Sequence, residues 1–165
     1  AGMGLLRRQI AAFGSLTKEV IMVPDLNTAR QLLEEGWQRN PGPWKNHSLT
    51  AAHCAKTIAE RLKMRGNDID PEKACILGML HDIGRREGVT WLAHTIDGYD
   101  YLMSLGYEKA ARICLTHSFP EKDVNTYIGR HDISAEDEQR LVTLLQSFDY
   151  KMGCQVEEVV GISPL

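Results

Sequence analysis

The chain has 165 residues, of which 43% are apolar and 25% are charged, and its formal net charge is −3. This composition is typical of one soluble globular domain with a core of its own. It lacks the basic footprint of a protein that binds nucleic acid. No stretch approaches the roughly 18 consecutive apolar residues of a membrane span.

The four cysteines favour a reducing compartment. Cys54, Cys75, Cys114 and Cys154 include no pair with C-x-x-C spacing, and each lies in a segment that reads as helix. A disulfide framework is not expected in a chain of this size and pattern. We therefore predict a cytoplasmic protein.

The apolar residues follow helical spacing through most of the chain. The predicted helices cover about residues 27–38, 44–64, 71–83, 91–105, 108–118 and 134–152. No segment alternates with a period of two over any length. The pattern predicts an all-α fold, a compact bundle of about six helices. We assign residues 25–165 to one domain and leave residues 1–24 as an N-terminal segment without a defined role.

Helix boundaries are marked by a few residues with known preferences. Pro71 occupies an expected first helical position, and Gly84 and Gly106 are expected to end the third and fourth helices. Ser134 and Asp137 match a capping box in which aspartate replaces the usual Glu or Gln. These signals separate one predicted helix from the next.

Six polar side chains fall on or beside the apolar faces of these helices. They are His47, His81, Asp82, His94, His117 and Asp149. A single histidine on an apolar face is usually a hydrogen-bonded core residue, and a single aspartate is usually a cap or an ion-pair partner. Four imidazoles and two carboxylates cannot easily satisfy one another, whereas a divalent cation takes both kinds of ligand. We therefore predict a metal site.

Three stretches carry a family resemblance: HSLTAAHCAKTIAERL (47–62), LGMLHDIGR (77–85) and SFDYKM (147–152). Together they resemble the HD superfamily of metal-dependent phosphohydrolases, over about residues 26–152. The family pattern H…HD…D falls on His47, His81, Asp82 and Asp149. His94 and His117 stand where the dinuclear branch carries two further histidines. That branch includes symmetrical diadenosine tetraphosphate hydrolases and cyclic-nucleotide phosphodiesterase-like domains.

The resemblance implies a dinuclear site and a reaction. Asp82 would bridge two divalent metals per chain, and Fe, Mn, Co, Ni or Zn would all suit nitrogen and oxygen ligands. A water on such a site ionises near neutral pH, and the hydroxide would attack phosphorus. The substrate would be a nucleotide or another small phosphoester or phosphoanhydride. Asp82 and Arg85 are the catalytic candidates, because Arg85 replaces the HDIGK lysine and suits phosphate. For Arg86, a favourable interaction of its charge with the C-terminus of a helix is at least as good an explanation as phosphate binding.

Other interpretations stay open. The domain could be a non-hydrolytic metal-binding sensor module, or a di-iron oxygenase on the same fold. The chain could also form a homodimer. We interpret Arg130-His131-Asp132 as a coincidental HD dipeptide, because it follows Gly129 in a predicted loop. His53 lies about 240° round the helix from His47 and cannot share its site.

Overall fold

The computed structural model of the protein describes residues 23–119 and 121–148. Within these residues it contains six α-helices, two short 3-10 helices and no strand, which confirms the predicted all-α class. The elements are α1 (Leu26–Arg39), α2 (Trp44–Met64), α3 (Pro71–Leu80), η1 (Ile83–Glu87), α4 (Ala93–Ser104), α5 (Glu108–Thr116), η2 (Val124–Thr126) and α6 (Ala135–Ser147). No helix in this part of the chain combines the length and apolar character that crossing a membrane requires.

Local sequence signals begin several of these helices. Pro71 is the first residue of α3, and the side chain of Asp70 before it accepts hydrogen bonds from the next two free backbone N–H groups. At the start of α6 the Ser134 hydroxyl accepts from the Asp137 backbone N–H at 3.0 Å and donates to the Asp137 carboxylate at 2.7 Å. Both predicted starts are confirmed, because each cap satisfies backbone donors that have no partner within the helix.

The predicted end of the third helix was wrong. The α-helix ends at Leu80 rather than Ile83, and Gly84 lies inside the 3-10 helix η1 instead of stopping α3. The reason is a close crossing between η1 and α4. A Cβ atom at Gly84 would lie 1.9 Å from the His94 carbonyl oxygen and 2.5 Å from the Gly98 nitrogen. Glycine is needed for this contact between two backbones, rather than for ending the helix.

The boundaries of three later helices also differ from the prediction. α4 begins at Ala93 rather than Trp91, and α5 ends at Thr116 rather than at residue 118. α6 ends at Ser147, whereas we predicted that it continues through residue 152. Phe148 is extended at the end of α6, with ψ of 139°, and its buried ring lies under the Arg112 guanidinium at 4.6 Å. Packing of this ring accounts for the departure from helical geometry.

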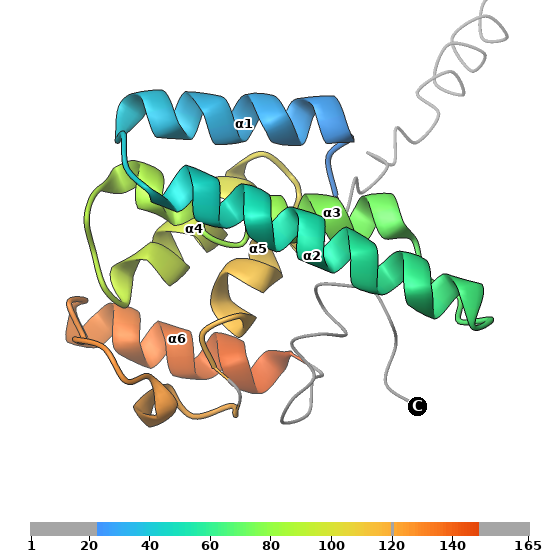
Figure 1. The fold of residues 1–165 in the computed structure, drawn as a ribbon. Helices are drawn as coiled ribbons and strands as arrows, with labels where there is room; N and C mark the ends of the chain where they lie inside the picture. Colours follow the sequence, from blue (N-terminus) through green and yellow to red (C-terminus); the bar gives the residue numbers. More distant parts are fainter. Residues whose placement is uncertain (1–22, 120, 149–165) are drawn as a thin grey trace, which may run out of the picture.

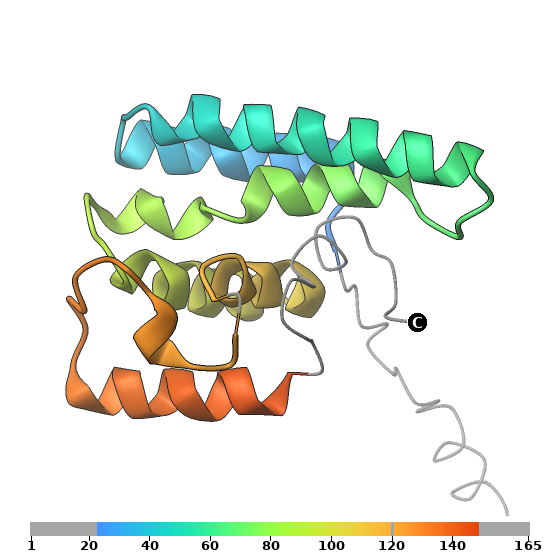
Figure 2. The same ribbon diagram turned by 60° about the horizontal axis from the view of Figure 1, so that its bottom comes forward.

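The helices are stacked in layers. α1 and α2 lie along one face with α3 against them, α4 and α5 form the middle of the molecule, and α6 covers the opposite side (Figures 1 and 2). Gly78 allows close contact between α3 and α2, since a Cβ there would lie 2.9 Å from the Ala51 carbonyl oxygen. The core includes Leu33, Leu77, Leu80, Leu102, Ile113, Leu115, Leu141 and Leu145, all fully or almost fully buried. The end of α3 therefore points into the centre of the molecule.

Candidate metal centre

His81 and Asp82 lie at the junction between α3 and η1. Residues 76–80, the second half of α3, are apolar or glycine and all buried, so the residues that follow the helix start inside the protein. His81 is 7% exposed and Asp82 is 4% exposed. An isolated buried carboxylate is costly unless charged or hydrogen-bonding groups surround it. The groups around Asp82 are therefore the central feature of the site.

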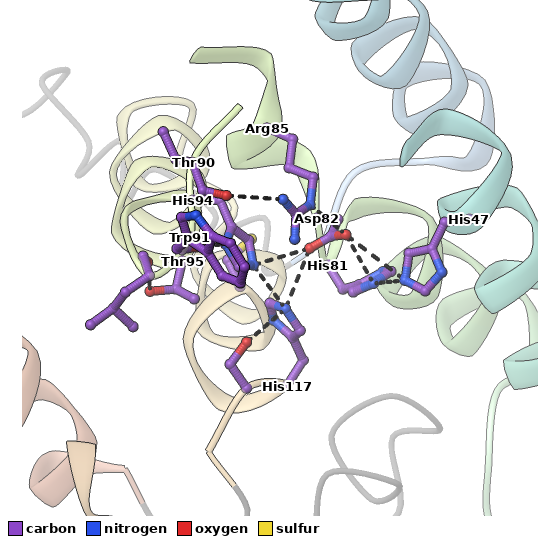
Figure 3. A network of polar contacts seen from close by, with 12 residues as sticks. His47, His81, Asp82, Arg85, Thr90, Trp91, His94, Thr95 and His117 are labelled. Atoms are coloured by element: carbon purple, nitrogen blue, oxygen red, sulfur yellow. Dashed lines mark hydrogen bonds and ion pairs between the residues drawn. The ribbon is translucent and has the colours of Figure 1, made fainter. Parts of the chain in front are cut away.

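Two pairs of histidines flank the Asp82 carboxylate (Figure 3). Its Oδ2 atom lies 3.8 Å from Nε2 of both His47 and His81. Its Oδ1 atom lies 3.2 Å from Nε2 of His94 and 3.4 Å from Nε2 of His117. Asp82 forms one group with His47 and His81 and a second group with His94 and His117. In each group the ligand atoms lie close enough together to hold a cation. One carboxylate thus offers a different oxygen to each pair.

Backbone carbonyls fix the orientation of three imidazoles. Nδ1 of His81 contacts the Gly78 carbonyl at 2.7 Å, Nδ1 of His117 contacts that of Ile113 at 3.0 Å, and Nδ1 of His94 contacts that of Trp91. A carbonyl only accepts, so each Nδ1 donates, and a neutral ring then presents a lone pair at Nε2. All three Nε2 atoms face the carboxylate.

The Nε2 atoms of each pair are in mutual contact. The distance is 3.1 Å between His47 and His81 and 3.3 Å between His94 and His117. Burial, followed by the charge of His117, lowers the pKa of His81 to about 4, so this ring is neutral near pH 7. Neutral, converging lone pairs beside an anion suit a divalent cation, and this donor set fits one.

Asp82 remains ionised despite its burial. Desolvation raises its pKa, but the neighbouring imidazoles of His117, His94 and His81 outweigh that effect and hold the pKa well below its usual range. A permanent negative charge therefore lies between the two histidine pairs. This negative charge attracts cations to the centre.

The two pairs differ in their access to solvent. His47, in the first turn of α2, has a side chain that is 63% exposed, whereas the His94 side chain is 3% exposed. The His47 side is therefore the open side of the centre. A small molecule would approach the carboxylate from there.

Arg85 faces the centre and Arg86 does not. The Arg85 Nε atom donates to Asp82 Oδ2 at 2.9 Å, and its Nη1 atom donates to the Thr90 carbonyl at 3.3 Å. Arg86 instead stacks over the Tyr101 ring at 3.7 Å. The two adjacent arginines thus have different surroundings, and only Arg85 could reach a ligand at the carboxylate.

A cavity of about 490 Å³ adjoins the open side of the centre. It is lined by Asn40, Pro41, Gly42, Pro43, Trp44, His47, Asp82, Arg85, Gly88 and Val89. The Asn-Pro-Gly-Pro-Trp turn at residues 40–44 supplies half of this lining, and we predicted no role at the site for it. The nearness of this turn to His47, three to seven residues along the chain, was the available signal.

Several predictions about single residues can now be compared with the structure. The structure brings together His47, His81, Asp82, His94 and His117, while Asp149 lies outside the described residues. His53 is exposed and away from these five residues, as expected. The Ser118 hydroxyl lies 3.0 Å from Nε2 of His117, which is the position expected of a residue that supports this ligand.

Asp132, from the coincidental HD dipeptide, supports the centre indirectly. Its carboxylate accepts from the backbone N–H of Trp91 at 2.7 Å and of Ala93 at 2.9 Å, at the start of α4. The Trp91 carbonyl in turn holds Nδ1 of His94. Because about 40 residues separate donor from acceptor, no sequence spacing could have revealed this role.

Comparison with known proteins gives one match. The family model of the HD domain matches residues 44–150. No curated protein and no solved structure shows a significant match. The matched range contains every residue of the two histidine pairs and the carboxylate between them.

Proposed function

Because this chain belongs to the HD domain family, we propose that it is a metal-dependent phosphohydrolase. The substrate would be a nucleotide or another small phosphoester or phosphoanhydride. The observation that supports this proposal is the Asp82 carboxylate, which lies between two histidine pairs and presents one oxygen to each. The reaction class comes from the family, because the fold alone does not define chemistry.

The five described residues divide into two ligand sets. His47, His81 and Asp82 would hold one divalent metal, and Asp82, His94 and His117 would hold a second. We also propose Asp149 as a ligand of the first metal, by its place in the family pattern. Iron, manganese, cobalt, nickel and zinc all accept this nitrogen and oxygen donor set. Bound divalent metals supply Lewis acidity, which acidifies water and neutralises charge on phosphate oxygens.

Arg85 would bind the phosphoryl group of the substrate. Its guanidinium is already within hydrogen-bond distance of Asp82, so it lies beside the place where phosphate would be held. If metals were bound to the carboxylate, the Arg85 Nε–H could donate to a phosphate oxygen instead of to Asp82. A planar guanidinium can offer two parallel hydrogen bonds to such a group.

The first experiment is to measure metal content per chain by elemental mass spectrometry, on protein purified without added metal or chelator. The proposal predicts about two divalent metals per chain, and phosphate release from members of a nucleotide and phosphoester panel. The Asp82→Ala variant should lose both metal and hydrolysis while keeping its helical circular dichroism.

A matched control distinguishes the centre from histidines in general. His53→Ala removes an exposed imidazole from the same helix that carries His47, and it should retain metal and activity. Full activity in Asp82→Ala would refute the assignment. Oxygen consumption under reducing conditions without phosphate release would favour the di-iron oxygenase, and metal binding without either reaction would favour the sensor module.

A further inference from the structure

The cavity beside the metal centre continues directly from it. His47, Asp82 and Arg85 belong to both, and the volume of about 490 Å³ is in the usual range for small-molecule sites, roughly 300–1000 Å³. A phosphoryl group held at Asp82 and Arg85 would leave the rest of its molecule in this cavity. The residues that line the cavity therefore help to determine which substrates can bind.

Residues 40–44 line the cavity as a largely apolar turn in which several polar groups already have hydrogen-bond partners. The Trp44 indole donates to the Asn40 carbonyl at 2.9 Å, and the Trp37 indole donates to the Gly42 carbonyl at 3.2 Å. The Asn40 side-chain amide donates to the Arg85 carbonyl at 2.7 Å. These bonds hold the turn in place and leave proline rings to line the cavity. Such a wall suits an apolar or aromatic surface more than a polar one.

Gly88 and Val89 also line the cavity. Val89 is 98% exposed, so its apolar side chain is open to a ligand. A ligand that contacts both Val89 and the proline-rich turn would cover apolar surface of each. Burial of apolar area is favourable at roughly 25 cal/mol per Å².

The charges near the cavity argue against a polyphosphate chain. Lys45 is paired with Glu34 at 2.5 Å, and Arg39 is paired with Glu87 at 2.5 Å. Arg86 is paired with Glu87 at 3.3 Å. Among the described residues that line the cavity, Arg85 is the only lysine or arginine. One guanidinium beside the metal centre can serve one phosphoryl group, whereas further phosphates would extend into a cavity whose described lining offers no second lysine or arginine.

We propose that this cavity holds the apolar or aromatic group of a phosphate monoester, with its single phosphoryl group at the metal centre and Arg85. This inference rests on the proposed phosphohydrolase function and narrows it to monoesters over polyphosphorylated compounds. In the reaction, the oxygen of one water forms a bond to phosphorus and the bond from phosphorus to the ester oxygen breaks. One water proton goes to the released alcohol or phenol, and the other stays with the phosphate.

The test uses the full metal-loaded chain and three probes: phenyl phosphate, methyl phosphate and tripolyphosphate. We expect kcat/KM for phenyl phosphate to exceed that for each of the other two by at least tenfold. Val89→Asp places a charge in the cavity without disturbing the core, and it should lower the phenyl-to-methyl ratio of kcat/KM about tenfold. The comparison of two substrates on one variant removes any general effect of the substitution on folding.

Ile128→Asp is the matched control, because Ile128 is also a fully exposed apolar residue and does not line this cavity. It should leave the phenyl-to-methyl ratio unchanged. Equal efficiency on methyl and phenyl phosphate, or preferred hydrolysis of tripolyphosphate, would overturn the inference while leaving the hydrolase function intact.

Binding of phenylphosphonate, which is not hydrolysed, separates the two proposals. Calorimetry should show tighter binding of phenylphosphonate than of methylphosphonate to the native chain, and Val89→Asp should remove the difference. This result without turnover of any phosphate ester would support the cavity and refute the hydrolase. Equal binding of the two phosphonates would overturn the cavity proposal whatever the activity.

Discussion

Substitution of Gly84 by alanine should separate the two halves of the metal centre. Gly84 follows Asp82 by two residues, and its backbone crosses that of α4 beside His94. It is not among the glycines with positive φ, so alanine could adopt its backbone conformation. The added methyl group is therefore a steric probe of the crossing alone.

The structure sets the size of the required movement. The new Cβ would lie 1.9 Å from the His94 carbonyl oxygen, whereas Cβ contacts shorter than 3.0 Å are essentially never observed. The backbone of α4 must therefore move away from η1 by about 1 Å. Overpacking that requires backbone shifts typically costs about 1–3 kcal/mol, and we expect the upper end because the obstacle is backbone rather than side chain. The same movement would lengthen the 3.2 Å contact between His94 Nε2 and Asp82 Oδ1.

Urea unfolding and metal analysis of the same preparation measure both effects. We expect Gly84→Ala to lose about 3 kcal/mol of unfolding free energy and about one bound metal per chain. Gly36→Ala is the control, because its Cβ would meet only side-chain atoms, none closer than 3.2 Å, and its cost should stay below about 1 kcal/mol. Native stability and unchanged metal content in Gly84→Ala would show that the crossing does not position His94.

Three further predictions concern charge and capping. Asp132→Ala should lower the unfolding free energy measured with urea by about 0.5–2 kcal/mol, because the start of α4 loses two hydrogen bonds. Asp132→Asn should lower it less. Equal stability of the native protein and both variants would show that Asp132 does not cap α4. Acid should lower the unfolding free energy of the metal-free protein between pH 6.5 and about 4. In this range His81 of the unfolded chain takes a proton, whereas burial and then the charge of His117 keep the pKa of folded His81 near 4. His81→Asn should flatten the plot of unfolding free energy against pH, and an unchanged slope would contradict the reasoning. Burial and then the charge of Glu87 raise the pKa of Asp97 to about 6, so its contribution to stability falls as pH rises from 3.8 to 6. Asp97→Asn should therefore add on the order of 1 kcal/mol at pH 7 after solvent screening, a gain that disappears near pH 4, and a gain independent of pH would point to another cause.

Local patterns predicted the helices well where the determinants are local. α2 has the predicted boundaries, and the Ser134 cap begins α6 as expected. The errors lie at helix ends that are determined by contacts with other parts of the fold. α3 ends early because Gly84 must lie against α4, and α6 ends at Ser147 because the Phe148 ring packs into the core.

The candidate centre was predicted from polar residues on apolar faces and from a family resemblance. Spacing along helices could indicate that His81, His94 and His117 project from buried faces, but it could not show that their Nε2 atoms meet at one carboxylate. That convergence depends on how α3, α4 and α5 pack. The hydrogen bonds that the start of α4 donates to Asp132 could not be predicted for the same reason. The metal ligand role of Asp149 stays a prediction.

The Asp82 carboxylate, which the two histidine pairs share, has a thermodynamic consequence. Two cations bound there would not be independent, because both would draw on the same negative charge and the same rigid side chain. Whatever factor the first ion imposes on the affinity of the second, the second must impose on the first. The occupancy of the more exposed position, beside His47, would then depend on whether the buried position beside His94 is filled. A centre built in this way could adjust its activity to metal supply without any separate regulatory domain.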